Sequence, residues 1–306
     1  MSGGTRSERP KPVSLTALAG KKTAGEPIVM VTAYDHPGAQ IADEAGVDMV
    51  LVGDSAANVV LGYDSTVPVT VDELLMLTRA VRRGLTSAFL VSDLPFGSYE
   101  ASDTEAVHTA QRFVKEGGAD AVKIERGGTT VDRARAIVRA GIPVVGHVGL
   151  TPQAATSLGG YTAQGRTADR AEHLIRDAVE LEAAGCFAVV IEAVPAAVTE
   201  LLVERLSCLT IGIGAGRSTD GQVLVWHDLL GISSGHLARF VRRFADVRGE
   251  MVRGVAAYAD AVRDGSFPAS EHTYGIGLAE LEALVGRLSP AGSVGPVGFP
   301  HLDADS

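Results

Sequence analysis

Four acidic residues and one lysine have the types and positions to do chemistry, because each lies at or near the end of a short apolar run. The acids that end such runs are Asp54, Asp93, Glu125 and Glu192. If the runs are parallel strands, their carboxyl ends meet where α/β folds place their chemistry. Lys123 lies two residues before Glu125, so both side chains should point to the same side of a strand. The sequence therefore predicts one charged cluster at an edge of a sheet.

Two carboxylates at neighbouring strand ends can hold a hard divalent cation, because Mg²⁺ prefers oxygen ligands and keeps several waters or substrate oxygens. Asp54 and Asp93 are the predicted pair. An ion held there could chelate a small 2-oxo acid and stabilise an enolate as it forms, and Lys123 would add positive charge at the same oxygens. Glu192 could then act as the base at the carbon beside the carbonyl.

A less specific interpretation applies to the same residues. An acid at a strand end can cap the next helix, and any one of the four acids could do only this. Caps at all four positions are disfavoured, because Glu is a poor cap and Lys123 lies inside a strand. His147 ends another apolar run. A single histidine in such a place is more often a packed or hydrogen-bonded residue than a catalyst.

Apolar runs separated by helix-like segments indicate parallel strands covered on both faces. Strands are predicted over residues 28–33, 48–54, 88–93, 120–125, 142–147, 187–192, 209–216 and 223–232. Helices are predicted over 131–140, 169–184, 198–206, 236–264 and 278–288, with capping boxes at Thr70/Glu73 and Ser102/Glu105 starting two more. About eight strand-then-helix units favour one (β/α)8 TIM barrel, with a doubly wound open sheet as the alternative.

Composition limits the class of protein. The chain has 306 residues, of which 46% are hydrophobic, so it can bury a large core. A net charge of -10 argues against nucleic-acid and membrane-surface partners. Cys186 and Cys208 lack metal-site spacing and are expected to be reduced, and the polar N-terminal residues do not form a signal peptide. A cytoplasmic protein is the expectation.

Eight motifs in order closely resemble the ketopantoate hydroxymethyltransferase (3-methyl-2-oxobutanoate hydroxymethyltransferase) family, over residues 12–272. They are VTAYD (31–35), LVGDS (51–55), GYDSTVPVT (62–70), SDLPF (92–96), VKIE (122–125), GHVGLTPQ (146–153), GGYTAQGR (159–166) and IGIGAG (211–216). The resemblance implies a (β/α)8 barrel of the phosphoenolpyruvate-binding type and a large, decamer-like homo-oligomer. It implies transfer of a one-carbon unit from 5,10-methylenetetrahydrofolate to 3-methyl-2-oxobutanoate, giving 2-dehydropantoate for pantothenate synthesis.

The resemblance also implies roles for individual residues. The Mg²⁺ ligands would be Asp54 and Asp93, with Glu125 reaching the metal through water. The oxo-acid contacts would be Asp54, Ser55, Asp93, Lys123 and His147, and the proton acceptor would be Glu192. The sequence predicts a barrel over residues 25–272, followed by an extension over 273–306. Residues 1–24 are expected to be a loose arm, with a short helix over 13–18 as the alternative for that part. The motifs assign no folate contacts.

The chain departs from the family at two places. Arg126 directly follows Glu125, and Gly128 stands where the family usually has an acid. The C-terminal motif is shortened to EHTYG (271–275), and residues 276–306 follow it. A paralogue acting on another 2-oxo acid, or a non-catalytic metabolite-binding paralogue, therefore stays open. A Mg²⁺-dependent carbon–carbon lyase or mutase is a further alternative, but neither cysteine lies in the loop motif that such lyases need.

Overall fold

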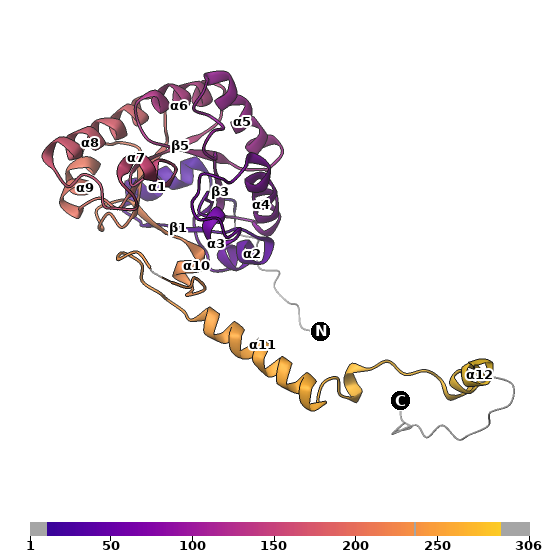
Figure 1. Cartoon of the computed structure of the whole chain (residues 1–306). Helices are drawn as coiled ribbons and strands as arrows, with labels where there is room; N and C mark the ends of the chain where they lie inside the picture. Colours follow the sequence, from indigo (N-terminus) through magenta and orange to yellow (C-terminus); the bar gives the residue numbers. More distant parts are fainter. Residues whose placement is uncertain (1–10, 236, 289–306) are drawn as a thin grey trace, which may run out of the picture. The chain divides into compact units, whose positions relative to one another are not determined.

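Eight parallel strands form a closed barrel in the computed structural model, which describes residues 11–235 and 237–288 (Figure 1). They are β1 (Ile28–Thr32), β2 (Met49–Val52), β3 (Phe89–Asp93), β4 (Ala121–Glu125), β5 (Val144–Gly149), β6 (Ala188–Glu192), β7 (Leu209–Ile213) and β8 (Gly221–Leu224). Each strand pairs with the next along the chain, and β8 pairs with β1. The predicted (β/α)8 barrel is confirmed, and the open doubly wound sheet is excluded.

Helices follow most of the strands. The longer ones around the barrel are α2 (His36–Glu44), α4 (Val71–Gly84), α5 (Asp103–Lys115), α6 (Thr129–Arg139), α8 (Ala168–Ala183) and α9 (Ala196–Val203). The side chain of Thr70 accepts a hydrogen bond from the Glu73 N–H, and Glu73 bonds back, so the predicted capping box starts α4. Ser102 accepts a hydrogen bond from the Glu105 N–H at the start of α5. Short helical turns, α3 (Ala56–Val59), η1 (Pro152–Ala154) and α7 (Ala155–Leu158), lie in the two long loops.

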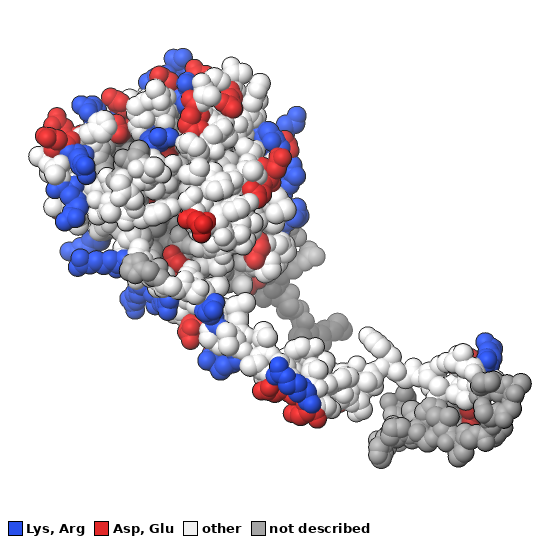
Figure 2. Space-filling model, viewed as in Figure 1, with Lys and Arg blue, Asp and Glu red and all other residues white. Residues whose placement is uncertain are grey.

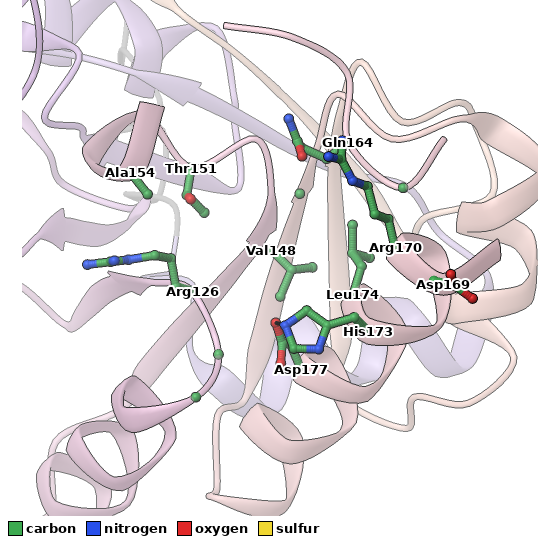
Figure 3. A pocket seen from close by; sticks show the side chains of 14 residues that line it. Arg126, Val148, Thr151, Ala154, Gln164, Asp169, Arg170, His173, Leu174 and Asp177 are labelled. Atoms are coloured by element: carbon green, nitrogen blue, oxygen red, sulfur yellow. Dashed lines mark ion pairs between the residues drawn. The ribbon is translucent and has the colours of Figure 1, made fainter. Parts of the chain in front are cut away.

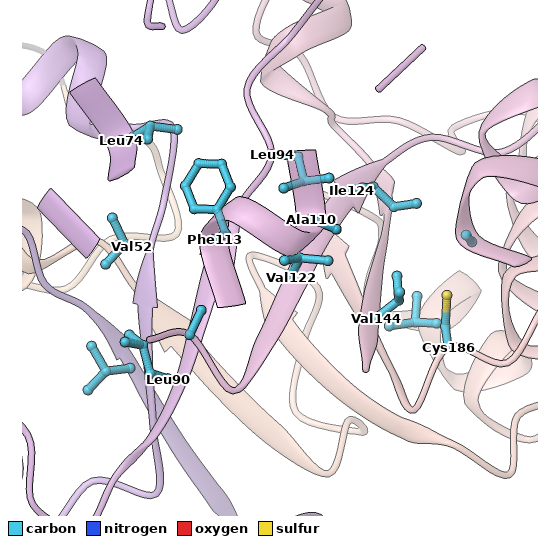
Figure 4. Packing of buried hydrophobic residues seen from close by; sticks show 14 of the residues in the cluster. Val52, Leu74, Leu90, Leu94, Ala110, Phe113, Val122, Ile124, Val144 and Cys186 are labelled. Atoms are coloured by element: carbon cyan, nitrogen blue, oxygen red, sulfur yellow. The ribbon is translucent and has the colours of Figure 1, made fainter. Parts of the chain in front are cut away.

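Two apolar layers hold the barrel. One fills its interior and contains Met49 and Leu51, whereas the alternate residues Val50 and Val52 pack outward against the helices. Figure 4 shows part of the outer layer, where Phe113 of α5 lies among strand residues. Because both faces of most strands are buried, these strands appear in the sequence as continuous apolar runs.

Residues 15–24, which the sequence placed in an arm, form helix α1 (Leu15–Ala24). Ser14 caps this helix by accepting a hydrogen bond from the Ala17 N–H. Leu18 is fully buried and belongs to the interior layer with Ile28. The segment therefore packs against one end of the barrel, which a polar composition did not indicate.

The last strand is earlier and shorter than the predicted 223–232. It starts at Gly221, where pairing with Ile28 of β1 sets its register. Directly after it, the Trp226 N–H donates to Thr32 Oγ1, and a short helix, α10 (Trp226–Leu229), begins. The Trp226 N–H therefore bonds to a side chain and not to a neighbouring strand, and β8 ends before it. Hydrophobicity alone had predicted that the strand continues.

The chain divides into two compact units, residues 1–248 and 249–306. Helix α11 (Val247–Asp264) starts later than the predicted 236, and α12 (Leu278–Leu288) matches its prediction. A short turn, η2 (Ser270–His272), lies between them. Residues 1–10 and 289–306, which include most of the predicted C-terminal extension, lie outside the described residues. Among the described helices, none combines the length and apolarity needed to cross a bilayer.

Basic and acidic side chains are intermixed on the face of residues 1–248 shown in Figure 2. Several of them form ion pairs between neighbouring helices, such as Arg79 with Glu116 (2.6 Å) and Arg112 with Asp72 (2.8 Å). Exposed pairs of this kind each contribute about 0–1 kcal/mol. Much of the surface charge is therefore locally balanced on this face.

Asp43 at the end of α2 fixes the start of β3. Its carboxylate accepts hydrogen bonds from the N–H groups of Thr86, Ser87 and Ala88, at 3.0, 3.0 and 2.8 Å, and from the hydroxyls of Thr86 and Ser87. Burial alone would raise the pKa of Asp43, but these hydrogen bonds lower it to about 2. The folded-state pKa lies below the unfolded value of about 3.9, so the carboxylate stabilises the fold above pH 4.

We expect Asp43→Asn to reduce the free energy of unfolding by about 1–2 kcal/mol at pH 7. The difference from wild type should shrink as pH falls from about 4 toward 2, because the wild-type carboxylate then takes up a proton. Urea denaturation at several pH values measures this, with the exposed Asp64→Asn as the control. A difference that does not depend on pH would contradict the assignment.

Candidate active site

A cavity of about 170 Å³ lies at the carboxyl ends of the strands. All seven predicted site residues line it, namely Asp54, Ser55, Asp93, Lys123, Glu125, His147 and Glu192. They come from strands β3 to β6 and from the turn after β2. The barrel thus brings together residues that are up to 138 positions apart in the chain, from 54 to 192.

Lys123 is the central cation of the site. Its Nζ lies 2.9 Å from Asp93 Oδ1, 3.6 Å from Glu125 Oε1 and 3.2 Å from His147 Nδ1. Lys123 and both acids are almost completely buried. Burial alone would lower the pKa of Lys123, but the charges of Asp93, Glu125 and Asp54 raise it, so the ammonium stays charged at neutral pH.

Three buried acids face this single ammonium. Burial raises the pKa of Asp54 and of Asp93 to about 6, and that of Glu125 to about 7. Lys123 opposes each of these increases, while the acids raise the pKa of one another. When all three are ionised, the cluster carries more negative than positive charge. This excess negative charge would attract a further cation.

His147 is neutral at physiological pH, because burial and the nearby Lys123 charge lower its pKa to about 4. Nδ1 lies 3.2 Å from the Lys123 ammonium, which can only donate, and 3.2 Å from Glu125 Oε1, which can only accept when it is ionised. In the tautomer that accepts from Lys123, the ring proton lies on Nε2, which is 3.3 Å from Glu192 Oε2 without the alignment of a full hydrogen bond. Glu192 lies at the rim, where 16% of its side chain is exposed.

The backbone is strained immediately after two of the acids. Arg126 follows Glu125 with φ 77°, and Ala193 follows Glu192 with φ 49°, so both adopt the left-handed conformation that disfavours side chains. Each is held by the strand ladder, since the Arg126 N–H donates to the His147 carbonyl and the Ala193 N–H to that of Ile213. Strain of this kind costs about 1–3 kcal/mol and gathers at functional sites.

Sequence reasoning missed three polar residues at this site. The Tyr34 hydroxyl lies 2.8 Å from Ser55 Oγ. Tyr99 and Gln153 are buried and hydrogen-bond to each other and to the acids. Gln153 and Tyr34 both lie inside motifs that were recognised, but no pattern of spacing marked either side chain as part of the cluster.

The donor set fits Mg²⁺. Within the described part of the chain, no three or more His, Cys, Asp or Glu side chains are arranged to hold a metal by themselves. Mg²⁺ needs fewer, because it commonly takes one or two carboxylates and completes its shell with waters and substrate oxygens. The Asp54 N–H donates to Asp93 Oδ2 at 2.9 Å, and Asp93 Oδ1 is paired with Lys123 Nζ at 2.9 Å. Three carboxylates around one ammonium leave an excess of negative charge, which suits a divalent ion.

A larger cavity of about 580 Å³ lies beside the first. Residues that follow site residues line it, such as Arg126 after Glu125 and Val148 after His147. Figure 3 shows Arg170 and His173 of α8 on one side of this cavity and Arg126 on the other, with Arg126 extending away from them. The two cavities thus lie on either side of the ends of β4 and β5.

The family model described as ketopantoate hydroxymethyltransferase matches residues 12–270. The chain belongs to this family. A 3-methyl-2-oxobutanoate hydroxymethyltransferase of Frankia alni is 53% identical over 270 residues, which cover 88% of this chain and 89% of that protein. The one from Moorella thermoacetica is 52% identical and covers 86% and 97%. Membership of the ketopantoate hydroxymethyltransferase family confirms the resemblance drawn from the motifs.

Solved structures share the fold at low sequence identity. A phosphoenolpyruvate phosphomutase from Streptomyces platensis aligns with TM-score 0.55 and 16% identity, covering 88% of this chain and 99% of that one. A phosphonopyruvate hydrolase in complex with oxalate and Mg²⁺ aligns with TM-score 0.56 and 14% identity, covering 90% and 98%. These similarities show that the chain shares the barrel fold of these proteins.

Proposed function

We propose that the chain is a 3-methyl-2-oxobutanoate hydroxymethyltransferase, which moves a one-carbon unit from 5,10-methylenetetrahydrofolate to 3-methyl-2-oxobutanoate and produces 2-dehydropantoate. The observation that carries the proposal is the meeting of seven predicted residues in one small cavity. Relatives at about 53% identity bear this enzyme's name. We place the enzyme in the cytoplasm as a homo-oligomer, in line with the family resemblance.

The residues have distinct tasks in this proposal. Asp54 and Asp93 would hold Mg²⁺ directly, and Glu125 would support it as an outer acid. Bound Mg²⁺ supplies Lewis-acid polarisation of the keto group. Lys123 faces the same oxygens with a permanent positive charge, and Ser55 offers a hydroxyl beside Asp54.

Glu192 takes the proton from C3 of the oxo acid. His147 positions it, because the neutral ring presents Nε2 to Glu192 Oε2 at 3.3 Å. The walls of the cavity exclude water, which protects the reactive one-carbon unit from hydrolysis. The chain thus supplies a base, a fixed cation and a water-poor site for one new carbon–carbon bond.

The smaller cavity suits a small substrate. Its volume of about 170 Å³ is below the usual range of roughly 300–1,000 Å³ for larger ligands. We therefore place the oxo acid in this cavity, beside Lys123 and Glu192.

The lyase alternative gains no support from the cysteines. Cys186 lies two residues before β6 and Cys208 directly precedes β7, so both lie at the opposite end of the strands from the acids. Burial raises the pKa of each thiol to about 12, which makes the reactive thiolate scarce. Neither residue is placed or ionised as a loop cysteine for acid–base work would be.

An assay with purified protein, Mg²⁺, 5,10-methylenetetrahydrofolate and 3-methyl-2-oxobutanoate should yield 2-dehydropantoate. A non-reactive folate analogue should compete with the folate substrate and not with the oxo acid. Mass spectrometry of the product identifies the reaction, and a panel of other 2-oxo acids tests the substrate. If the protein formed no product from 3-methyl-2-oxobutanoate but turned over another 2-oxo acid, that acid would replace 3-methyl-2-oxobutanoate as the proposed substrate.

A further inference from the structure

Gln153 makes four hydrogen bonds, and two of them reach carboxylates of the site. Its backbone N–H donates to Glu125 Oε2 at 3.0 Å, and its side-chain Nε2 donates to Asp54 Oδ2 at 3.0 Å. Nε2 also donates to the Leu94 carbonyl at 3.0 Å, and Oε1 accepts from the Tyr99 hydroxyl at 2.6 Å. One residue in the loop after β5 thus joins acids from β2 and β4 with the loop after β3.

Tyr99 fixes which way the amide of Gln153 points. Its hydroxyl accepts a hydrogen bond from the Glu125 N–H at 3.2 Å, and it has one proton, which it donates to Gln153 Oε1. If the amide were reversed, Oε1 would face Asp54 Oδ2 and the Leu94 carbonyl, and all three are acceptors. The orientation in the structure is therefore the one in which each of these groups has a partner.

These bonds take up one oxygen of each acid. Gln153 binds Asp54 Oδ2 and Glu125 Oε2, so the other oxygen of each carboxylate is directed away from Gln153. Glu125 Oε1 accordingly lies near Lys123 and His147. Because Gln153 and Tyr99 are 5% and 0% exposed, water does not compete for these bonds. The carboxylates of Asp54 and Glu125 are therefore already oriented before a cation binds.

We propose that Gln153, oriented by Tyr99, is a positioning residue that sets the carboxylates of Asp54 and Glu125 for a divalent cation. The inference rests on the cation site of the proposed function and adds residues to it. Groups that orient metal ligands through hydrogen bonds typically change metal affinity by about 10–100-fold when they are removed. Gln153 acts through the acids and does not touch the substrate.

The test is direct binding of Mn²⁺ to the metal-free protein, measured by titration calorimetry and by the loss of the free Mn²⁺ electron paramagnetic resonance signal. Gln153→Met keeps the length of the side chain and removes its hydrogen bonds. We expect its Kd for Mn²⁺ to rise by about 10–100-fold at a temperature well below its Tm. Gln164→Met is the matched control, because this buried amide donates to Thr162 and to none of the acids.

Tyr99→Phe keeps the ring and removes the hydroxyl, so it tests the same idea if Gln153→Met fails to fold. It should raise the Kd in the same direction by a smaller factor. An unchanged Kd in whichever variant folds would overturn the inference, as would absence of Mn²⁺ binding by the wild type. Mn²⁺ binding that depends on Gln153 in a protein that forms no 2-dehydropantoate would leave the inference intact and refute the proposed function.

Discussion

Glu192→Gln should abolish exchange of the C3 proton of 3-methyl-2-oxobutanoate with deuterium, with a rate at least 10²–10⁴-fold below wild type. Glutamine has nearly the same shape and can still meet His147 Nε2, which lies 3.3 Å from Glu192 Oε2. It cannot accept a proton. The variant therefore removes the base and leaves the cavity. Exchange followed by proton NMR in D₂O with Mg²⁺, with and without tetrahydrofolate, measures the effect.

Two controls separate the loss of a base from the loss of a site. Mn²⁺ affinity should be unchanged in Glu192→Gln, because Glu192 is not among the proposed metal ligands. Glu200→Gln makes the same chemical change on the exposed side of the helix that follows β6, and it should retain wild-type exchange. If Glu192→Gln exchanged the proton at the wild-type rate, another group would have to be the base.

Lys123→Met is expected to destabilise the metal-free protein by about 3–5 kcal/mol, because it leaves buried acids without their cation. Burial raises the pKa of Asp54, Asp93 and Glu125, and Lys123 is the charge that opposes this. Without Lys123 the folded protein should hold protons that the unfolded chain releases. The stability of the variant should therefore fall as pH rises from about 4 toward 8.

The same variant should lose about 10²–10³-fold in kcat/KM, because a fixed positive charge is lost where the oxo acid gains negative charge. Urea denaturation in the presence of a chelator gives the stability, and the double variant Lys123→Met/Asp93→Asn is the control. Removing both partners of the 2.9 Å pair should restore part of the stability. A single variant as stable as wild type at pH 8 would show that Lys123 does not compensate the acids.

The sequence could predict the site because parallel strands expose their ends at one edge. An acid that ends a largely apolar strand is expected at the carboxyl edge of the sheet, so the positions of Asp93, Glu125 and Glu192 could be predicted from the sequence. Lys123 followed from the two-residue repeat of a strand. The closed ring followed from the number of strand-then-helix units. Each of these inferences uses only local pattern and a general property of the fold.

Other features depended on contacts between distant residues. Gln153 lies 99 positions from Asp54 and 54 from Tyr99, so no local pattern connects them. Leu18 is buried only because the interior of the barrel is next to it. The end of β8 depends on Thr32 capturing the Trp226 N–H across 194 positions. Long-range contacts of this kind produce no periodic pattern of residues, so they could not be predicted from the sequence.

The pairing of β8 with β1 has a consequence for synthesis of the chain. Until Gly221–Leu224 leaves the ribosome, seven strands form an unclosed sheet, and the backbone groups of β1 and β7 have no partner on one side. Such open edges can pair with the strands of other nascent chains. The barrel can therefore close only after residues 221–224 have left the ribosome. Until then, its open edges can pair with nascent chains on the same polysome.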